Sequence, residues 1–161
     1  MPELFERDYQ TAEALDFKQK DAPEAIAKWQ RSKKCAQDLM ALLPNFKNDP
    51  KHGNAHYRAN IALGLHAMRE GDGKAAAAYL LAASEAPPTE EMSYGAAGSR
   101  LESRLVNAML KYGDLDAVAT YYERTAKMFE SKRDERLAAA AAIHKGVMPE
   151  LYQWAVAQGQ I

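Results

Sequence analysis

The chain has 161 residues, with 21 Lys and Arg against 22 Asp and Glu, a formal net charge of −1, and 47% hydrophobic but only 9% aromatic residues. This length fits one domain or one short repeat array, and the composition excludes a disordered chain. The balanced charge argues against a nucleic-acid-binding protein, which usually carries a basic excess. No apolar run reaches the length of a transmembrane helix, so we expect no membrane span.

The N-terminal residues carry neither the basic flank nor the apolar stretch of a signal peptide. The single cysteine, Cys35, excludes an intramolecular disulfide and a cysteine-based zinc site. We therefore expect a cytoplasmic protein, although a chain from which a leader peptide had been removed would show the same pattern.

Apolar residues recur at spacings of three and four along most of the chain, and strand-like alternation is scarce. This periodicity predicts an all-α protein. Proline and glycine residues divide it into about eight helices, with loops expected at 45–53 and 87–98. The expected helices span about 2–19, 23–43, 54–69, 74–86, 99–112, 115–130, 134–146 and 149–158.

The turns between these helices resemble one another. Gly71-Asp72 is followed by Ala75-Ala76 and then Tyr79-Leu80, and Gly113-Asp114 is followed in the same register by Ala117-Val118 and Tyr121-Tyr122. A weaker copy begins at Lys20-Asp21. Similar turns at similar offsets indicate repeated pairs of helices.

One helix pair matches a known repeat. Over residues 57–88, the matching positions are Leu63-Gly64, Ala76, Leu80 and Pro88, and this pair resembles a tetratricopeptide repeat. Asn60 and Ala67 depart from the pattern, and the units at about 6–37 and 99–130 are degenerate. The resemblance implies a single tetratricopeptide-like α-solenoid over residues 1–161, with capping helices at about 134–158. The alternative is an irregular bundle of antiparallel helices.

In tetratricopeptide arrays, the first helix of each pair lines a concave groove that binds peptides. The resemblance therefore implies an acidic or carboxylate-bearing peptide, held by Arg100 and Arg104 above an apolar floor of Ile61 and Leu65. The complete set of expected groove residues is Arg58, Ile61, Leu65, Arg69, Arg100, Arg104, Asn107 and Lys111.

Other motifs do not assemble a catalytic or metal site. His52 and His56 lack the intervening glutamate of a zinc protease, and Gly71-Asp72-Gly73-Lys74 lacks the frame of a phosphate-binding loop. We interpret the basic stretch of Lys28, Arg31, Lys33 and Lys34 as a solvated helix face. The expected function is a non-enzymatic protein- or peptide-binding or scaffold module, without catalytic residues, metal or cofactor.

Two other functions remain open. A helical bundle would bind a small molecule, or catalyse a reaction, if His56, Tyr57 and His66 converged in a pocket. The third function is that of a homo-oligomerising structural protein. The last expected helix carries apolar groups on more than one side, which would cap the array or pair two chains: Leu151, Tyr152, Trp154 and Val156.

Overall fold

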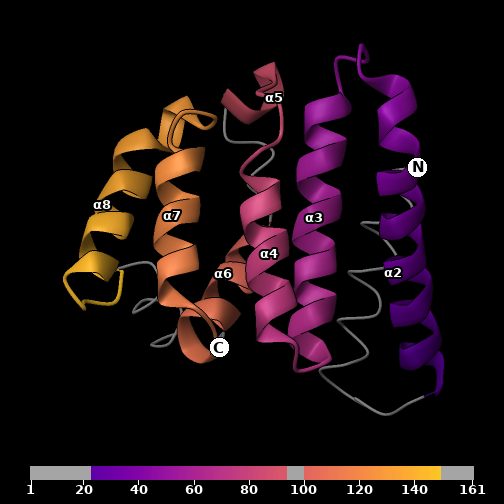
Figure 1. The fold of residues 1–161 in the computed structure, drawn as a ribbon, viewed down its shortest axis with the longest axis horizontal. Helices are drawn as coiled ribbons and strands as arrows, with labels where there is room; N and C mark the ends of the chain where they lie inside the picture. The colour runs from indigo at the N-terminus through magenta and orange to yellow at the C-terminus, as the bar shows by residue number, and fades with distance from the viewer. Residues whose placement is uncertain (1–22, 94–99, 150–161) are drawn as a thin grey trace.

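A computed structural model describes residues 23–93 and 100–149 (Figure 1). Within these ranges the chain forms seven α-helices and two short 3-10 helices and contains no strand, which confirms the all-α prediction. The expected helix at 2–19 lies outside the described residues, as does the helix at 149–158 after its first residue. The elements are α2 (Pro23–Leu42), η1 (Leu43–Phe46), α3 (His52–Arg69), α4 (Gly73–Ala83), α5 (Glu90–Ser93), α6 (Arg100–Tyr112), α7 (Leu115–Thr125), η2 (Glu130–Lys132) and α8 (Arg133–His144).

Two aspartates begin helices in the same way. The carboxylate of Asp72 accepts a hydrogen bond from the backbone N–H of Ala75 at 2.9 Å, and that of Asp114 accepts one from Ala117 at 3.1 Å. Both are helix N-caps, which satisfy backbone donors in the first turn. The two Gly-Asp turns predicted to be equivalent therefore share one capping geometry.

Some boundaries differ from the prediction. α4 ends at Ala83 and α7 at Thr125, earlier than expected. After Thr125 the chain leaves the helix and places Phe129 in the core, where it is fully buried. Residues 90–93, expected to be loop, form α5 because the Thr89 hydroxyl caps the backbone N–H of Met92 at 3.3 Å.

The helices form a row with one helix packed across it. Figure 1 shows α2, α3, α4, α7 and α8 in that order, and contacts join each helix to the next. α6 packs against α3, α4 and α7. In a repeat array, corresponding helices of successive pairs pack on one another. Helix α3 packs on α6, and α4 packs on α7, as such an array requires. Two other pairs that would correspond, α2 with α4 and α6 with α8, make few contacts within the described residues.

No helix of the described ranges combines the length and apolar character that a bilayer crossing requires.

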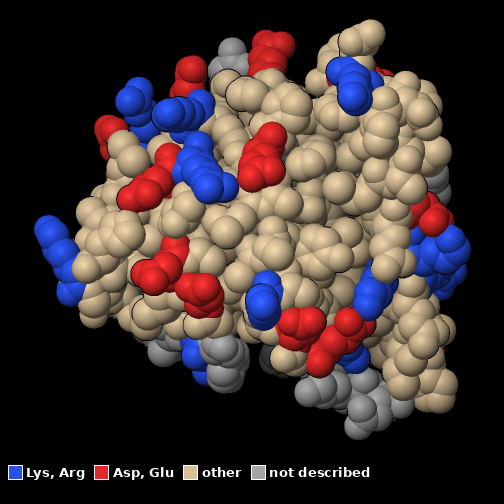
Figure 2. All heavy atoms as spheres, in the orientation of Figure 1, with Lys and Arg blue, Asp and Glu red and all other residues tan. Residues whose placement is uncertain are grey.

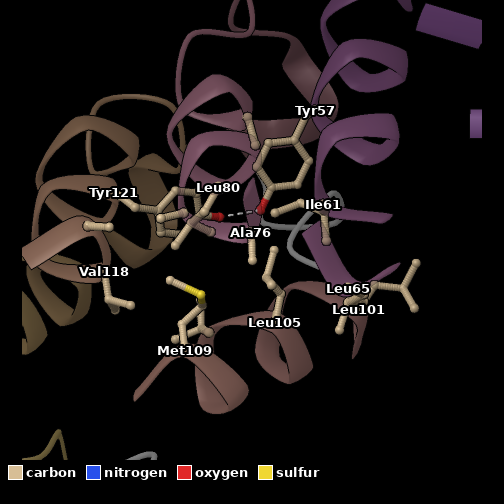
Figure 3. Close-up of a cluster of buried hydrophobic side chains, with 14 of the residues drawn as sticks. Tyr57, Ile61, Leu65, Ala76, Leu80, Leu101, Leu105, Met109, Val118 and Tyr121 are labelled. Atoms are coloured by element: carbon tan, nitrogen blue, oxygen red, sulfur yellow. Dashed lines mark hydrogen bonds between the residues drawn. The ribbon is translucent and has the colours of Figure 1, made fainter. Parts of the chain in front are cut away.

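The core lies where α3, α4, α6 and α7 meet (Figure 3). Leu80, Leu105 and Met109 are fully buried there. Gly64 brings α6 close to α3, because a Cβ at this position would lie 2.6 Å from Cδ2 of Leu105. The Leu-Gly pair of the tetratricopeptide resemblance thus occupies a close contact between helices.

A second close contact, at Gly53, gives a testable prediction. A Cβ on Gly53 would lie 1.9 Å from the carbonyl oxygen of Pro87 and 2.8 Å from Cγ2 of Thr89. We expect Gly53→Ala to lower the free energy of unfolding by about 2 kcal/mol, because the backbone at Pro87 must move. Gly73→Ala, where a Cβ meets nothing within 4 Å, is the matched first-turn control and should be neutral or slightly stabilising. Equal urea midpoints for the two variants would contradict this packing.

Candidate functional site

Ile61 and Leu65 belong to the core and do not form an open floor. Their exposed fractions are 1% and 9%. They lie beside Leu101 and Leu105 of α6, which covers this side of α3 (Figure 3). The prediction that these two residues form an apolar floor open to a peptide is therefore wrong. Sequence reasoning placed them opposite the packing face of α3, but α3 is buried on nearly every side along its middle turns.

The two arginines of α3 lie far apart. Nη2 of Arg58, in the second turn of α3, donates a hydrogen bond to Oε1 of Glu91 at 2.9 Å. The guanidinium carbon of Arg69, at the C-terminal end of α3, lies 4.5 Å from the ring centroid of Trp29. About three helical turns separate Arg58 from Arg69, or roughly 16 Å, so the two cannot hold the same carboxylate.

The remaining expected groove residues lie on α6. Arg104 and Asn107 are half-buried and Lys111 is exposed, whereas the side chain of Arg100 lies outside the described residues. Spacings of three and four place Arg104, Asn107 and Lys111 along one side of the helix. The carboxylate clamp of Arg100 and Arg104 stays a prediction.

A surface pocket of about 210 Å³ lies between α2 and the C-terminal end of α3. Figure 2 shows acidic and basic side chains gathered over the lower ends of α3 and α4, below a largely uncharged face. The pocket combines an indole, an aliphatic side chain, polar groups and charges of both signs. Its lining residues are Ile26, Trp29, Gln30, Lys33, His66, Arg69 and Glu70.

Trp29 and His66 form the aromatic wall of this pocket. Their rings meet edge to face with centroids 5.0 Å apart. Nε2 of His66 shares a hydrogen bond of 2.9 Å with the hydroxyl of Ser32, which is fully buried. Burial lowers the pKa of His66 to about 4, and the positive charge of Lys33 adds to this effect. His66 is therefore neutral at pH 7.

Charged groups flank the wall. Nζ of Lys33 lies 2.5 Å from Oε1 of Glu70, so this ion pair joins α2 to the end of α3. Arg69 stacks on Trp29 as described above. Because His66 is neutral at pH 7, the described lining residues carry two cations and one carboxylate.

This pocket was not predicted from the sequence. Lys33 was expected on a solvated helix face and Arg69 in the groove. The sequence feature that could have indicated the pocket is a spacing of four residues. It separates Trp29 from Lys33 on α2, and His66 from Glu70 at the C-terminal end of α3. Only the packing of α2 on α3 shows that these turns face each other.

A buried polar network was likewise not predicted from the sequence. The hydroxyls of Tyr57 and Tyr121 are 2.6 Å apart (Figure 3), and Tyr121 donates to Oε1 of Glu102 at 2.8 Å. The same carboxylate oxygen lies 2.6 Å from Nη2 of Arg136, whose Nη1 donates to the hydroxyl of Thr125 at 2.9 Å. The network connects α3, α6, α7 and α8 through side chains that are all buried.

The charges in this network compensate each other. Burial, together with the carboxylate of Glu102, holds the pKa values of Tyr57 and Tyr121 well above the ordinary tyrosine range. Burial, the largest single influence, lowers the pKa of Arg136, but the charge of Glu102, the two tyrosines and the hydrogen bond to Glu102 together raise it above its ordinary value. The guanidinium carbon also lies 4.0 Å from the ring centroid of Phe129. Because these side chains are buried, a substrate cannot reach them, and their contacts join α3, α6, α7 and α8.

The three residues of the alternative pocket do not converge. Tyr57 points into the core toward Tyr121, and His66 bonds to Ser32 between α2 and α3. His56 lies instead beside His52, with ring centroids 6.5 Å apart. Within residues 23–93 and 100–149, no three His, Cys, Asp or Glu side chains are grouped so that they could hold a metal ion.

No protein-family model matches the chain, and neither a curated protein nor a solved structure matches it. The tetratricopeptide resemblance therefore rests on the sequence pattern, which is most specific over residues 57–88.

Proposed function

We propose that the protein is a non-enzymatic binding module of tetratricopeptide-like type, which holds a segment of another protein. The observation that carries this proposal is the pocket between α2 and α3. Its indole wall and its few charged groups are the features with which peptide- and ligand-binding sites combine apolar contact and orientation. The packing of α3 on α6 and of α4 on α7 supports the repeat-like arrangement.

The pocket favours an acidic or carboxylate-bearing segment. Among the lining residues that the structure describes, Lys33 and Arg69 are cations and Glu70 is a carboxylate that pairs with Lys33, and the low pKa of His66 keeps its ring neutral. Ile26, which is 42% exposed, supplies apolar contact beside these charges, and Trp29, which is 8% exposed, forms the inner part of the lining. A carboxylate next to an apolar side chain would therefore meet both parts of the lining.

The state of the buried charges supports binding over catalysis. A general acid or base must reach the substrate by a hydrogen bond or through one water molecule. Glu102 and Arg136 are 6% and 4% exposed and bond to each other. Glu102 and Arg136 therefore stabilise the fold and cannot reach a substrate, whereas the charges at the α2–α3 pocket lie at the surface.

Peptide display on the full chain, followed by affinity measurements with synthetic peptides, tests the proposal. We expect selected peptides to contain Asp, Glu or a free C-terminal carboxylate, and to bind more weakly when that group is converted to an amide. Lys33→Glu should weaken binding about tenfold or more, since it places a negative charge at the pocket.

Lys34→Glu is the matched control, because Lys34 is the adjacent residue, lies outside the pocket lining and has a side chain that is 73% exposed. It should bind the selected peptides like the unmodified chain. Failure to select any peptide would contradict the proposed function. Selected peptides that bind Lys33→Glu and Lys34→Glu equally would contradict the choice of the α2–α3 pocket as the site.

A further inference from the structure

Helix α8 is the edge helix of the row (Figure 1). One face packs toward α7 through Ala139, Ala140 and Ile143, together with Arg136, whose guanidinium is fixed by the buried ion pair with Glu102. The buried arginine holds α8 in one orientation on α7. The opposite face of α8 consequently points away from α7 and from the other helices that the structure describes.

This outward face has an ordered pattern. Asp134, Ala138, Ala141 and Lys145 follow one another at spacings of four, three and four, so they form one stripe along the helix. All four are exposed, and Leu137 beside them is 41% exposed. The stripe has a negative end, a small apolar middle with a leucine at its side, and a positive end.

We propose that the α8 face, defined by Asp134, Leu137, Ala138, Ala141 and Lys145, pairs with the same face of a second copy of the chain. Two such helices would lie antiparallel across a two-fold axis.

The spacing makes this face self-complementary. Asp134 and Lys145 are centred on the same point as Ala138 and Ala141, between residues 139 and 140. Rotation about a two-fold axis at that point therefore brings each Asp134 opposite the partner's Lys145. The same rotation brings each Ala138 opposite the partner's Ala141. An isologous interface requires this property, in which one patch complements itself.

Small side chains at the centre of the α8 face and opposite charges at its ends favour a second copy of the chain as the partner. Alanines let two helix backbones approach closely, and Leu137 would be covered at the side of the contact. A parallel pairing would place like charges together at both ends, which is unfavourable. The charges thus select the antiparallel pair.

The length of α8 determines how strong the proposed dimer is expected to be. Its 12 residues span roughly 18 Å, and a helix pair of that length buries less surface than a standard protein interface. We therefore expect a weak dimer that dissociates on dilution. The α8 face lies at the opposite end of the row from α2, so dimerisation leaves both α2–α3 pockets accessible.

Charge reversal followed by mixing tests this proposal. Sedimentation velocity of the full chain over a wide concentration range should show a monomer–dimer equilibrium. Asp134→Lys alone and Lys145→Asp alone should each weaken self-association about tenfold or more, because each places like charges at both ends of the pair. An equimolar mixture of the two variants should recover the dimer, since every facing pair is then opposite in charge.

Lys127→Asp reverses an exposed charge on a residue outside the α8 face and serves as the control. It should leave self-association unchanged. A monomer at every concentration would overturn the proposal. A dimer that both single variants retain, or variants that do not associate when mixed, would overturn it as well. These outcomes do not depend on peptide binding, so the proposed function and the α8 dimer stand or fall separately.

Discussion

Glu102→Leu is expected to lower the free energy of unfolding by about 3–5 kcal/mol, which is the cost of leaving a buried charge without its partner. Arg136 is 4% exposed, and the Glu102 carboxylate lies 2.6 Å from its guanidinium. The substitution also removes the acceptor for the hydroxyl of Tyr121, at 2.8 Å. Urea unfolding followed by circular dichroism measures the loss.

A double variant separates the charge effect from a change in packing. Glu102→Leu with Arg136→Met removes both charges and retains apolar volume, so it should recover most of the stability that Glu102→Leu loses. Arg124→Ala is the surface control, because Arg124 pairs with Glu85 at 3.6 Å where both side chains are exposed. Its effect should be far smaller. Glu102→Leu as stable as the unmodified chain would show that the ion pair does not hold α6 and α8 together.

Acidification from pH 7 to pH 4 is expected to destabilise the fold by about 3 kcal/mol through His66 alone. Its pKa is about 4 in the folded chain, against an ordinary value of 6.5. The unfolded chain therefore binds a proton at a pH where folded His66 does not. The contribution of neutral His66 to the free energy of unfolding is fully present above pH 6.5 and is lost as the pH falls toward 4. Burial is the main cause, Lys33 and Arg69 oppose the protonated form, and Glu70 favours it.

His66→Gln isolates this contribution. Glutamine keeps a polar group near Ser32 but does not titrate, whereas the carboxylates titrate in both proteins. We expect the unmodified chain to lose more stability than the variant between pH 7 and pH 4, by about the amount given above. Identical pH profiles of the free energy of unfolding would contradict the buried, neutral state of His66.

The helices and their turns could be predicted from sequence because their determinants are local. Asp72 and Asp114 cap helices through the backbone three residues later, and apolar residues at spacings of three and four indicate the helices themselves. Helix ends were less predictable where tertiary contacts decide them. α7 ends at Thr125 because Phe129 enters the core and Arg136 bonds to the hydroxyl of Thr125.

The sites depend on contacts between distant segments, and for that reason sequence could not locate them. Glu102 and Arg136 look like ordinary helix-surface charges, and only the packing of α6 and α8 about α7 pairs them. Ile61 and Leu65 were expected to face a groove because the first helix of a tetratricopeptide pair lines the concave side of the array. α6 instead packs on that side of α3. Lys33 and Glu70 likewise meet only because α2 lies against α3.

The central claim, that the pocket between α2 and α3 binds a segment of another protein, is tested most directly by NMR. A display-selected peptide is titrated into the full, ¹⁵N-labelled chain. The chain has two tryptophans, so a Trp154→Phe variant assigns the indole resonance of Trp29. The proposal predicts that this indole resonance and the backbone amides of Lys33, His66 and Arg69 shift together as the pocket fills. Saturable binding that leaves these resonances in place while others move would contradict it.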